Sequence, residues 1–110
     1  MTSTPIPSPV VRAMERFGRN ISLARRRRNL TQVDLAGRIG VTVNTVRRLE
    51  AGHPGVALQH IARALQVFGE LEKLEALMDT AHDSIGMALQ DEKLPKIIQP
   101  PRGRKNAGAF

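Results

Sequence analysis

The chain contains no cysteine, which excludes a disulfide framework and a cysteine-based zinc site. It has no apolar run near the ~18 residues that a membrane span needs. The N-terminal stretch lacks the basic region followed by an apolar region that marks a secretory signal. These absences predict a cytoplasmic protein in a reducing compartment.

The residue sets that carry catalysis are missing as well. No catalytic triad, carboxylate pair or phosphate-binding glycine loop can be assembled from the sequence. The histidines, His53, His60 and His82, lack the i, i+4 spacing of a metal-binding pair. We therefore expect no catalytic residue, no metal and no cofactor, and a protein that binds rather than an enzyme.

Acidic residues are scarce near both ends of the chain, and basic residues are scarce in residues 56–92. Residues 1–30 hold seven arginines and one glutamate, and residues 93–110 hold five basic residues and no acid. Residues 56–92 hold seven acidic and two basic residues. A basic surface suits a polyanion, most often nucleic acid. The acidic part would repel phosphate, so we expect it to face solvent or another protein.

Apolar residues spaced three and four apart predict an all-α protein with about five helices and no convincing strand. Thr31 and Thr42 are expected to begin two of the helices as N-caps, and Gly40 to end one. The expected helices cover 10–28, the stretch between Thr31 and Gly40, 43–51, 56–67 and 70–78, with a short sixth at 83–89. Residues 95–98 are the one stretch that could pair as a strand.

The length of 110 residues suggests one small domain. Residues 1–9 contain three prolines and small polar residues, which predicts a flexible arm. We place the folded domain at 10–80 and a partly disordered C-terminal extension at 81–110.

The most informative segment is QVDLAGRIGVTVNTVRRLE, residues 32–50. Ala36 is small where a second helix must cross closely, Gly40 stands at the turn, and Val46 points back into the angle between the helices. The rest of the wedge is filled by Leu35, Ile39, Val41 and Leu49. This agreement of small, turn and apolar positions predicts a helix-turn-helix.

From Phe17 to about residue 68 the chain resembles the Cro/XRE family of helix-turn-helix repressors. The matching positions are Phe17-Gly18, Arg25, Leu30-Thr31-Gln32, Leu35-Ala36, Gly40-Val41-Thr42 and Glu50-Ala51-Gly52. The resemblance implies a five-helix Cro/repressor-like DNA-binding domain whose third helix, here 43–51, enters the DNA major groove. It also implies a structural ion pair between Arg25 and Glu50.

The start of this recognition helix is expected to read bases. Asn44 can pair with adenine, Arg47 with guanine, and Val43 can contact a thymine methyl group. Phosphate contacts are expected from residues around the two helix starts, namely Arg26, Arg27, Gln32, Thr42, Thr45 and Arg48. Arg28 stays undecided, because it can equally bond the carbonyls that end its own helix.

Cro-like domains usually bind a palindromic operator in double-stranded DNA as a homodimer. Leu71, Leu74, Leu77 and Met78 supply either a dimer or partner face, or the closure of the monomer core. The segment LEALMDTAHDSIGMALQDEKLPK is similar to the tails of HipB-type antitoxins, which implies a HipA-type kinase toxin as partner. The basic tail 93–105 could contact DNA, order on the toxin or serve only solubility.

Two other functions remain open. One is a free-standing phage-type or metabolic repressor without a toxin. The other is a protein-interaction module that no longer binds DNA.

Overall fold

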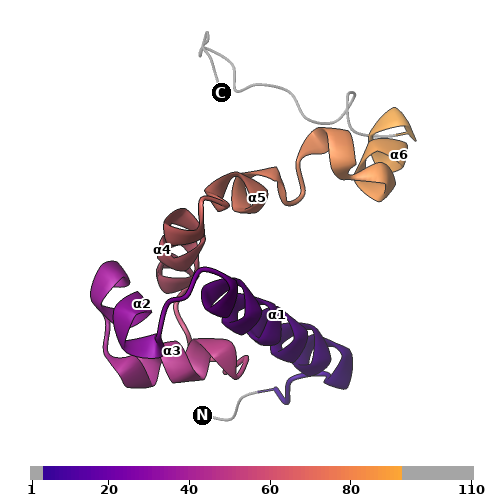
Figure 1. The fold of residues 1–110 in the computed structure, drawn as a ribbon. Coiled ribbons are helices and arrows are strands. Elements are labelled where there is room, and N and C mark those ends of the chain that lie inside the picture. Colours follow the sequence, from indigo (N-terminus) through magenta and orange to yellow (C-terminus); the bar gives the residue numbers. More distant parts are fainter. Residues whose placement is uncertain (1–3, 93–110) are drawn as a thin grey trace, which may run out of the picture. The chain divides into compact units, whose positions relative to one another are not determined.

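The computed structural model describes residues 4–92, and those residues are all-helical with no strand (Figure 1). The all-α prediction is confirmed. The elements are α1 (Ser8–Arg27), α2 (Gln32–Ile39), α3 (Val43–Glu50), α4 (Leu58–Phe68), α5 (Leu71–Ala76), a 3-10 turn (Thr80–His82) and α6 (Ser84–Glu92). The possible strand at 95–98 and the basic tail at 93–105 lie outside the described residues.

Helix α1 begins two residues earlier than predicted, at Ser8, so the expected arm 1–9 is too long. Pro7 is the N-cap and Pro9 lies in the first turn. The first N–H groups of a helix have no intrahelical acceptor, so proline loses no bond there and its fixed φ suits the helix. The prolines were therefore a start signal rather than a sign of a flexible arm. At the other end, Asn29 just beyond the helix has a left-handed conformation, with φ 57°.

The later helices also differ from the predicted bounds. Helix α3 ends at Glu50, one residue early, because Ala51 is its C-cap. Helix α4 begins at residue 58 rather than 56, since Ala57 is extended, and it ends at Phe68 rather than 67, with Gly69 as its C-cap at φ 77°. Helix α5 covers Leu71–Ala76 instead of 70–78, and Met78 beyond it has a positive φ of 61°. The sixth helix covers Ser84–Glu92 instead of 83–89.

The chain divides into two compact units, Met1–Leu74 and Glu75–Phe110. In the first unit α1 and α2 each pack against both α3 and α4. The core lies where these four helices meet, and its buried members are Ile21, Leu35, Ala36, Ile39, Val46, Leu49, Ala64 and Phe68. In the second unit α6 packs against the 3-10 turn.

The apolar residues of α5 and of the stretch just after it differ in exposure. Leu77 is 69% exposed and Met78 is 75% exposed, and no residue of α5 is buried. Leu71 and Leu74 are half-buried. The two alternatives for these residues, a dimer or partner face and closure of the monomer core, both stay predictions.

Helix α1 crosses the end of α3 with backbone against backbone. A Cβ atom added to Gly18 would lie 2.5 Å from the carbonyl oxygen of Glu50. A Cβ atom added to Gly52 would lie 2.6 Å from the carbonyl oxygen of Met14, and Gly52 also has φ 76°. Both positions therefore require glycine. We call this contact the Gly18–Gly52 crossing, and it fixes the middle of α1 to the residues that end α3.

Candidate nucleic-acid interface

Local hydrogen bonds set the starts of α2 and α3, as the sequence predicted. The backbone N–H of Asp34 donates to Thr31 Oγ1 at 2.9 Å, and the N–H of Thr31 donates to Asp34 Oδ2 at 2.8 Å, which is a capping box. The N–H of Thr45 donates to Thr42 Oγ1 at 3.2 Å. Between the two helices Gly40 has φ 73°, the left-handed conformation in which glycine has no steric cost. These contacts give the turn its shape.

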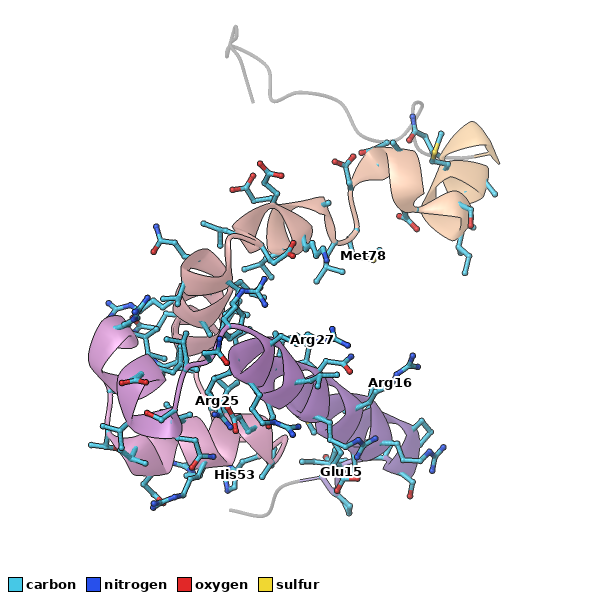
Figure 2. All side chains as sticks on the ribbon, viewed as in Figure 1. Glu15, Arg16, Arg25, Arg27, His53 and Met78 are labelled. Atoms are coloured by element: carbon cyan, nitrogen blue, oxygen red, sulfur yellow. The ribbon has the colours of Figure 1, made fainter. Side chains whose placement is uncertain are left out.

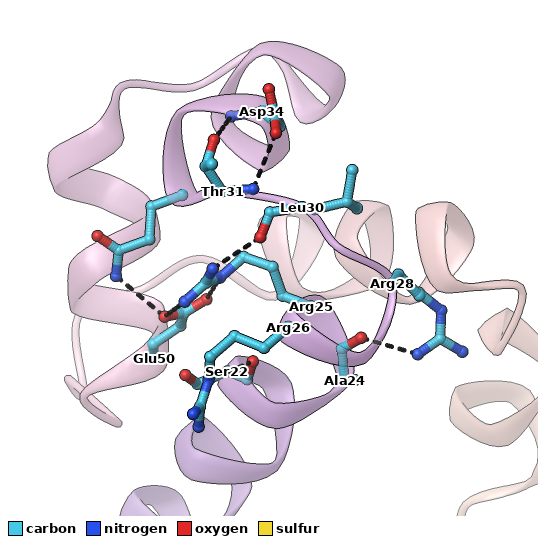
Figure 3. Close-up of polar contacts among 10 residues, drawn as sticks. Ser22, Ala24, Arg25, Arg26, Arg28, Leu30, Thr31, Asp34 and Glu50 are labelled. Atoms are coloured by element: carbon cyan, nitrogen blue, oxygen red, sulfur yellow. Dashed lines mark hydrogen bonds and ion pairs between the residues drawn. The ribbon is translucent and has the colours of Figure 1, made fainter.

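A bidentate ion pair joins α1 to the end of α3 (Figure 3). Arg25 Nε donates to Glu50 Oε2 at 2.6 Å, and Arg25 Nη2 donates to Glu50 Oε1 at 3.0 Å. Arg25 Nη1 also donates to the carbonyl of Leu30 at 2.8 Å, and Gln32 Nε2 donates to Glu50 Oε1 at 3.0 Å. The Arg25 and Glu50 side chains are 11% and 7% exposed. One carboxylate thus connects α1, the start of α2 and the end of α3.

The protonation of Glu50 is coupled to this network. Burial raises the pKa of Glu50, but the hydrogen bonds from Arg25 and Gln32 outweigh burial, and the pKa lies below its ordinary value of 4.5. A carboxyl group with a lower pKa in the folded state binds fewer protons when folded than when unfolded. Its contribution to stability is therefore present above pH 4.5 and is lost as the pH falls through the folded-state pKa.

We expect the free energy of unfolding to be steady above about pH 5 and to decrease at lower pH. Glu50→Gln should show a weaker decrease, measured by urea denaturation at a series of pH values. Asp34→Asn is the matched comparison, because the backbone N–H of Thr31 also lowers the pKa of exposed Asp34. An unchanged acid dependence in Glu50→Gln would contradict the role given to Glu50.

The face of α3 that points away from the core carries the expected base-reading residues. Asn44 and Arg47 are exposed, whereas Val46 and Leu49 on the opposite face are buried. Val43 is half-buried against the core, so only part of its side chain is accessible. The structure thus brings Asn44 and Arg47 together on one open surface and leaves Val43 at its edge.

Residues expected to hold phosphates lie around this surface. Arg48 Nη2 lies 3.4 Å from His53 Nδ1, which also accepts a hydrogen bond from the N–H of Gly55 at 2.9 Å. The hydroxyl groups of Thr42 and Thr45 are 3.1 Å apart. The side-chain amide of Gln32 is engaged by Glu50, so a phosphate at this helix start would meet the first N–H groups of α2, which have no intrahelical acceptor.

The expected phosphate ligands on α1 point in different directions. Arg26 and Arg27 are both exposed. Arg26 Nε reaches back to the carbonyl of Ser22 at 3.4 Å. Arg27 points away from Arg25 and therefore away from the ion pair with α3 (Figure 2).

Arg28, which the sequence left undecided, joins two helix ends. Its Nη1 donates to the carbonyl of Ala24 at 2.9 Å, and its Nη2 donates to the carbonyl of Phe68 at 3.0 Å. Its guanidinium carbon also lies 5.0 Å from the centre of the Phe68 ring. A basic residue in the last turn of a helix is a recognisable signal. The hydrogen bond to Phe68 had no signal in the sequence, because Phe68 is 40 positions away from Arg28.

Within residues 4–92, no helix combines the length and the apolar character that crossing a membrane requires. The same part of the chain brings together no group of three or more acidic or histidine side chains that could hold a metal ion.

A comparison with protein families matches residues 21–79 to the family described as "Helix-turn-helix". The match covers more than half of the chain and includes α2, α3 and α4. Comparisons with curated proteins and with solved structures give no match. The capped helices, the glycine turn and the family match agree, and α3 takes the position of the recognition helix. The chain therefore belongs to the helix-turn-helix family of the Cro/C1 (XRE) type, whose domains bind DNA in transcription regulators.

Proposed function

We propose that this protein is a sequence-specific transcriptional repressor that binds a palindromic operator in double-stranded DNA as a homodimer in the cytoplasm. The observation that carries the proposal is the open face of α3. Asn44 and Arg47 are exposed there, and the buried Arg25–Glu50 ion pair holds the end of the same helix. A rigid helix with amide and guanidinium groups on its outer face suits recognition of base edges in the major groove.

In this proposal Asn44 and Arg47 read bases, and Val43 contributes a smaller apolar contact. Binding strength comes from phosphate contacts, because these dominate affinity without selecting sequence. The proposed phosphate ligands near α3 are Arg26, Gln32, Thr42, Thr45 and Arg48. Arg27, which the sequence also suggested as a phosphate ligand, lies on a different surface, the outer face of α1, and we do not count it among the operator contacts.

The test compares two kinds of variant in gel-shift titrations on the DNA upstream of the protein's own gene. Asn44→Ala or Arg47→Ala should weaken binding to the operator by about 1–3 kcal/mol and reduce the preference over unrelated duplex. Arg48→Ala should weaken binding to every duplex to a similar extent and lower the dependence on salt.

Two outcomes of these titrations would contradict the proposal. Binding that is absent, or that does not respond to salt, would rule out the DNA-binding function and favour a protein-interaction module. Identical effects of Arg47→Ala and Arg48→Ala would show that the division between base and phosphate contacts is wrong.

We further propose that the protein is the antitoxin of a HipBA-like pair and neutralises a HipA-type kinase toxin. Supporting this, the second unit has exposed apolar side chains at Leu77, Met78, Ile85 and Leu89. Residues 75–92 also hold five acidic residues and no lysine or arginine. An acidic surface with exposed apolar groups suits a protein partner rather than DNA. Co-purification with a kinase encoded by the adjacent gene separates an antitoxin from a free-standing repressor.

A further inference from the structure

The outer face of α1 carries a row of arginines that the operator-binding surface does not use. With about 100° per residue, Arg12, Arg16, Arg19 and Arg27 fall within an arc of about 80°. The buried residues of the helix, Gly18, Ile21 and Arg25, lie on the opposite side. We call these four arginines the outer stripe, and all four are exposed.

No ion pair in the described part of the chain involves the outer stripe. The ion pairs there involve Arg25, Arg28 and Lys73 and none of the four arginines. Glu15, the one acidic residue of α1, is three residues from Arg12 and four from Arg19 but forms no ion pair with either, and Figure 2 shows it on a different side of the helix from Arg16. Four unpaired guanidinium groups thus create a continuous positive potential on one side of the helix.

Part of the outer stripe lies before the residues that match the family model. The family match begins at residue 21, whereas α1 begins at Ser8. Arg12, Arg16 and Arg19 therefore lie before the matched region. The Gly18–Gly52 crossing holds this part of α1 against the end of α3 through backbone contact. This part of α1 is thus fixed in direction relative to the recognition helix.

The outer stripe and the DNA-reading face point in opposite directions. One side of α3 packs against α1, and the other side presents Asn44 and Arg47. The outer stripe lies on the side of α1 that is turned away from the core and α3, as Arg16 and Arg27 show in Figure 2. A straight duplex in contact with α3 cannot also meet this face.

The chemistry of the outer stripe fits a phosphate backbone better than a protein. The large apolar residue among these arginines is Leu23, which is only 38% exposed, whereas protein interfaces usually have an apolar centre. From Arg12 to Arg27 the helix rises about 22 Å. A duplex presents about a dozen phosphates over that length. Arginine is the side chain best suited to bind phosphate in a bidentate manner.

We propose that the outer stripe binds the phosphate backbone of a second DNA segment, so that one protein bridges the duplex read by α3 and another duplex of any sequence. This inference rests on the proposed function for its first duplex. The second contact carries no sequence information, because guanidinium groups bind phosphates alike on all sequences.

The experiment uses the full chain, a labelled operator duplex and an unrelated duplex fixed to beads. Protein saturated with operator is expected to retain the label on the beads at low salt. The triple variant Arg12→Gln, Arg16→Gln, Arg19→Gln should bind operator normally, as measured in a gel shift. Its affinity for the second duplex should fall at least about tenfold, and the log–log salt slope of that contact should decrease by about 3. The corresponding triple lysine variant keeps the charge and should restore retention.

Three results would overturn the inference. The first is that the glutamine variant retains as much label as the wild type. The second is that the glutamine variant loses as much affinity for the operator as for the second duplex, which would place the outer stripe on the operator duplex. The third is stronger stripe-dependent binding of polyglutamate than of duplex. Failure of the proposed function would give a different result. Wild-type protein would then bind all duplexes with the same affinity, Arg47→Ala would leave that affinity unchanged, and only the change at Arg12, Arg16 and Arg19 would reduce it. Circular dichroism melting of each variant confirms that the helix is intact.

Discussion

Replacing Glu50 with alanine is expected to lower the free energy of unfolding by about 3–5 kcal/mol. The variant leaves the Arg25 guanidinium, whose side chain is 11% exposed, without a carboxylate. Only the carbonyl of Leu30 would still accept a hydrogen bond from it. Gln32 would lose its partner as well, so the contact between the starts and ends of three helices would be broken. Urea denaturation followed by circular dichroism measures the loss.

A double substitution separates the contribution of the two charges from that of side-chain packing. Arg25→Met combined with Glu50→Leu removes both charges and should recover most of the stability, because apolar residues often replace a buried ion pair at little cost. Glu72→Ala, at an exposed acidic position on α5, is the surface control and should change stability by less than about 0.5 kcal/mol. A loss below about 1 kcal/mol for Glu50→Ala would show that water screens the pair, as in surface salt bridges.

Gly52→Ala is the second substitution with a large expected effect, a loss of about 3 kcal/mol. Part of this cost is conformational, because Gly52 has φ 76°, where an L-residue with a side chain is strained. The rest is steric, since the new methyl group would lie 2.6 Å from the carbonyl oxygen of Met14 and 2.7 Å from Cα of Glu15. These are backbone atoms, so α1 itself would have to move. Thermal and urea unfolding measure the effect.

The chain offers matched controls for each part of this cost. Gly69 has nearly the same φ, 77°, but no atom lies within 4 Å of an added Cβ, so Gly69→Ala should show the strain alone, about 1 kcal/mol. Gly37 lies within α2 with open space around it, and Gly37→Ala should be neutral or stabilise by up to about 1 kcal/mol. Equal losses for Gly52→Ala and Gly69→Ala would mean that the Gly18–Gly52 crossing is loose in solution.

The helix-turn-helix could be predicted from sequence because its signals are local. Thr31 with Asp34, Gly40 and Thr42 each act within a few residues of the chain, and the structure shows all three at the expected helix ends. The start of α1 could not be placed correctly, because a proline in a first turn and a proline in a flexible arm look alike in sequence.

Contacts between residues far apart in the sequence could not be predicted, because they leave no local sequence pattern. The bond from Arg28 to Phe68 and the crossing of Gly18 with Gly52 depend on where whole helices meet. The pairing of Arg25 with Glu50 was expected only through the family resemblance, since spacing alone says nothing about residues 25 positions apart. The base contacts of Asn44 and Arg47 stay predictions, because their partner is a DNA molecule and not this chain.

The Gly18–Gly52 crossing also makes α1 a reporter of the recognition helix. Backbone touches backbone there, so reorientation of the end of α3 must carry the middle of α1 with it. The chain has no cysteine, and a single cysteine introduced at exposed Ala13 would accept one spin label outside the DNA-reading face. The width of its resonance spectrum would then follow the ordering of α3 as DNA is added, without a label on any residue proposed to contact DNA.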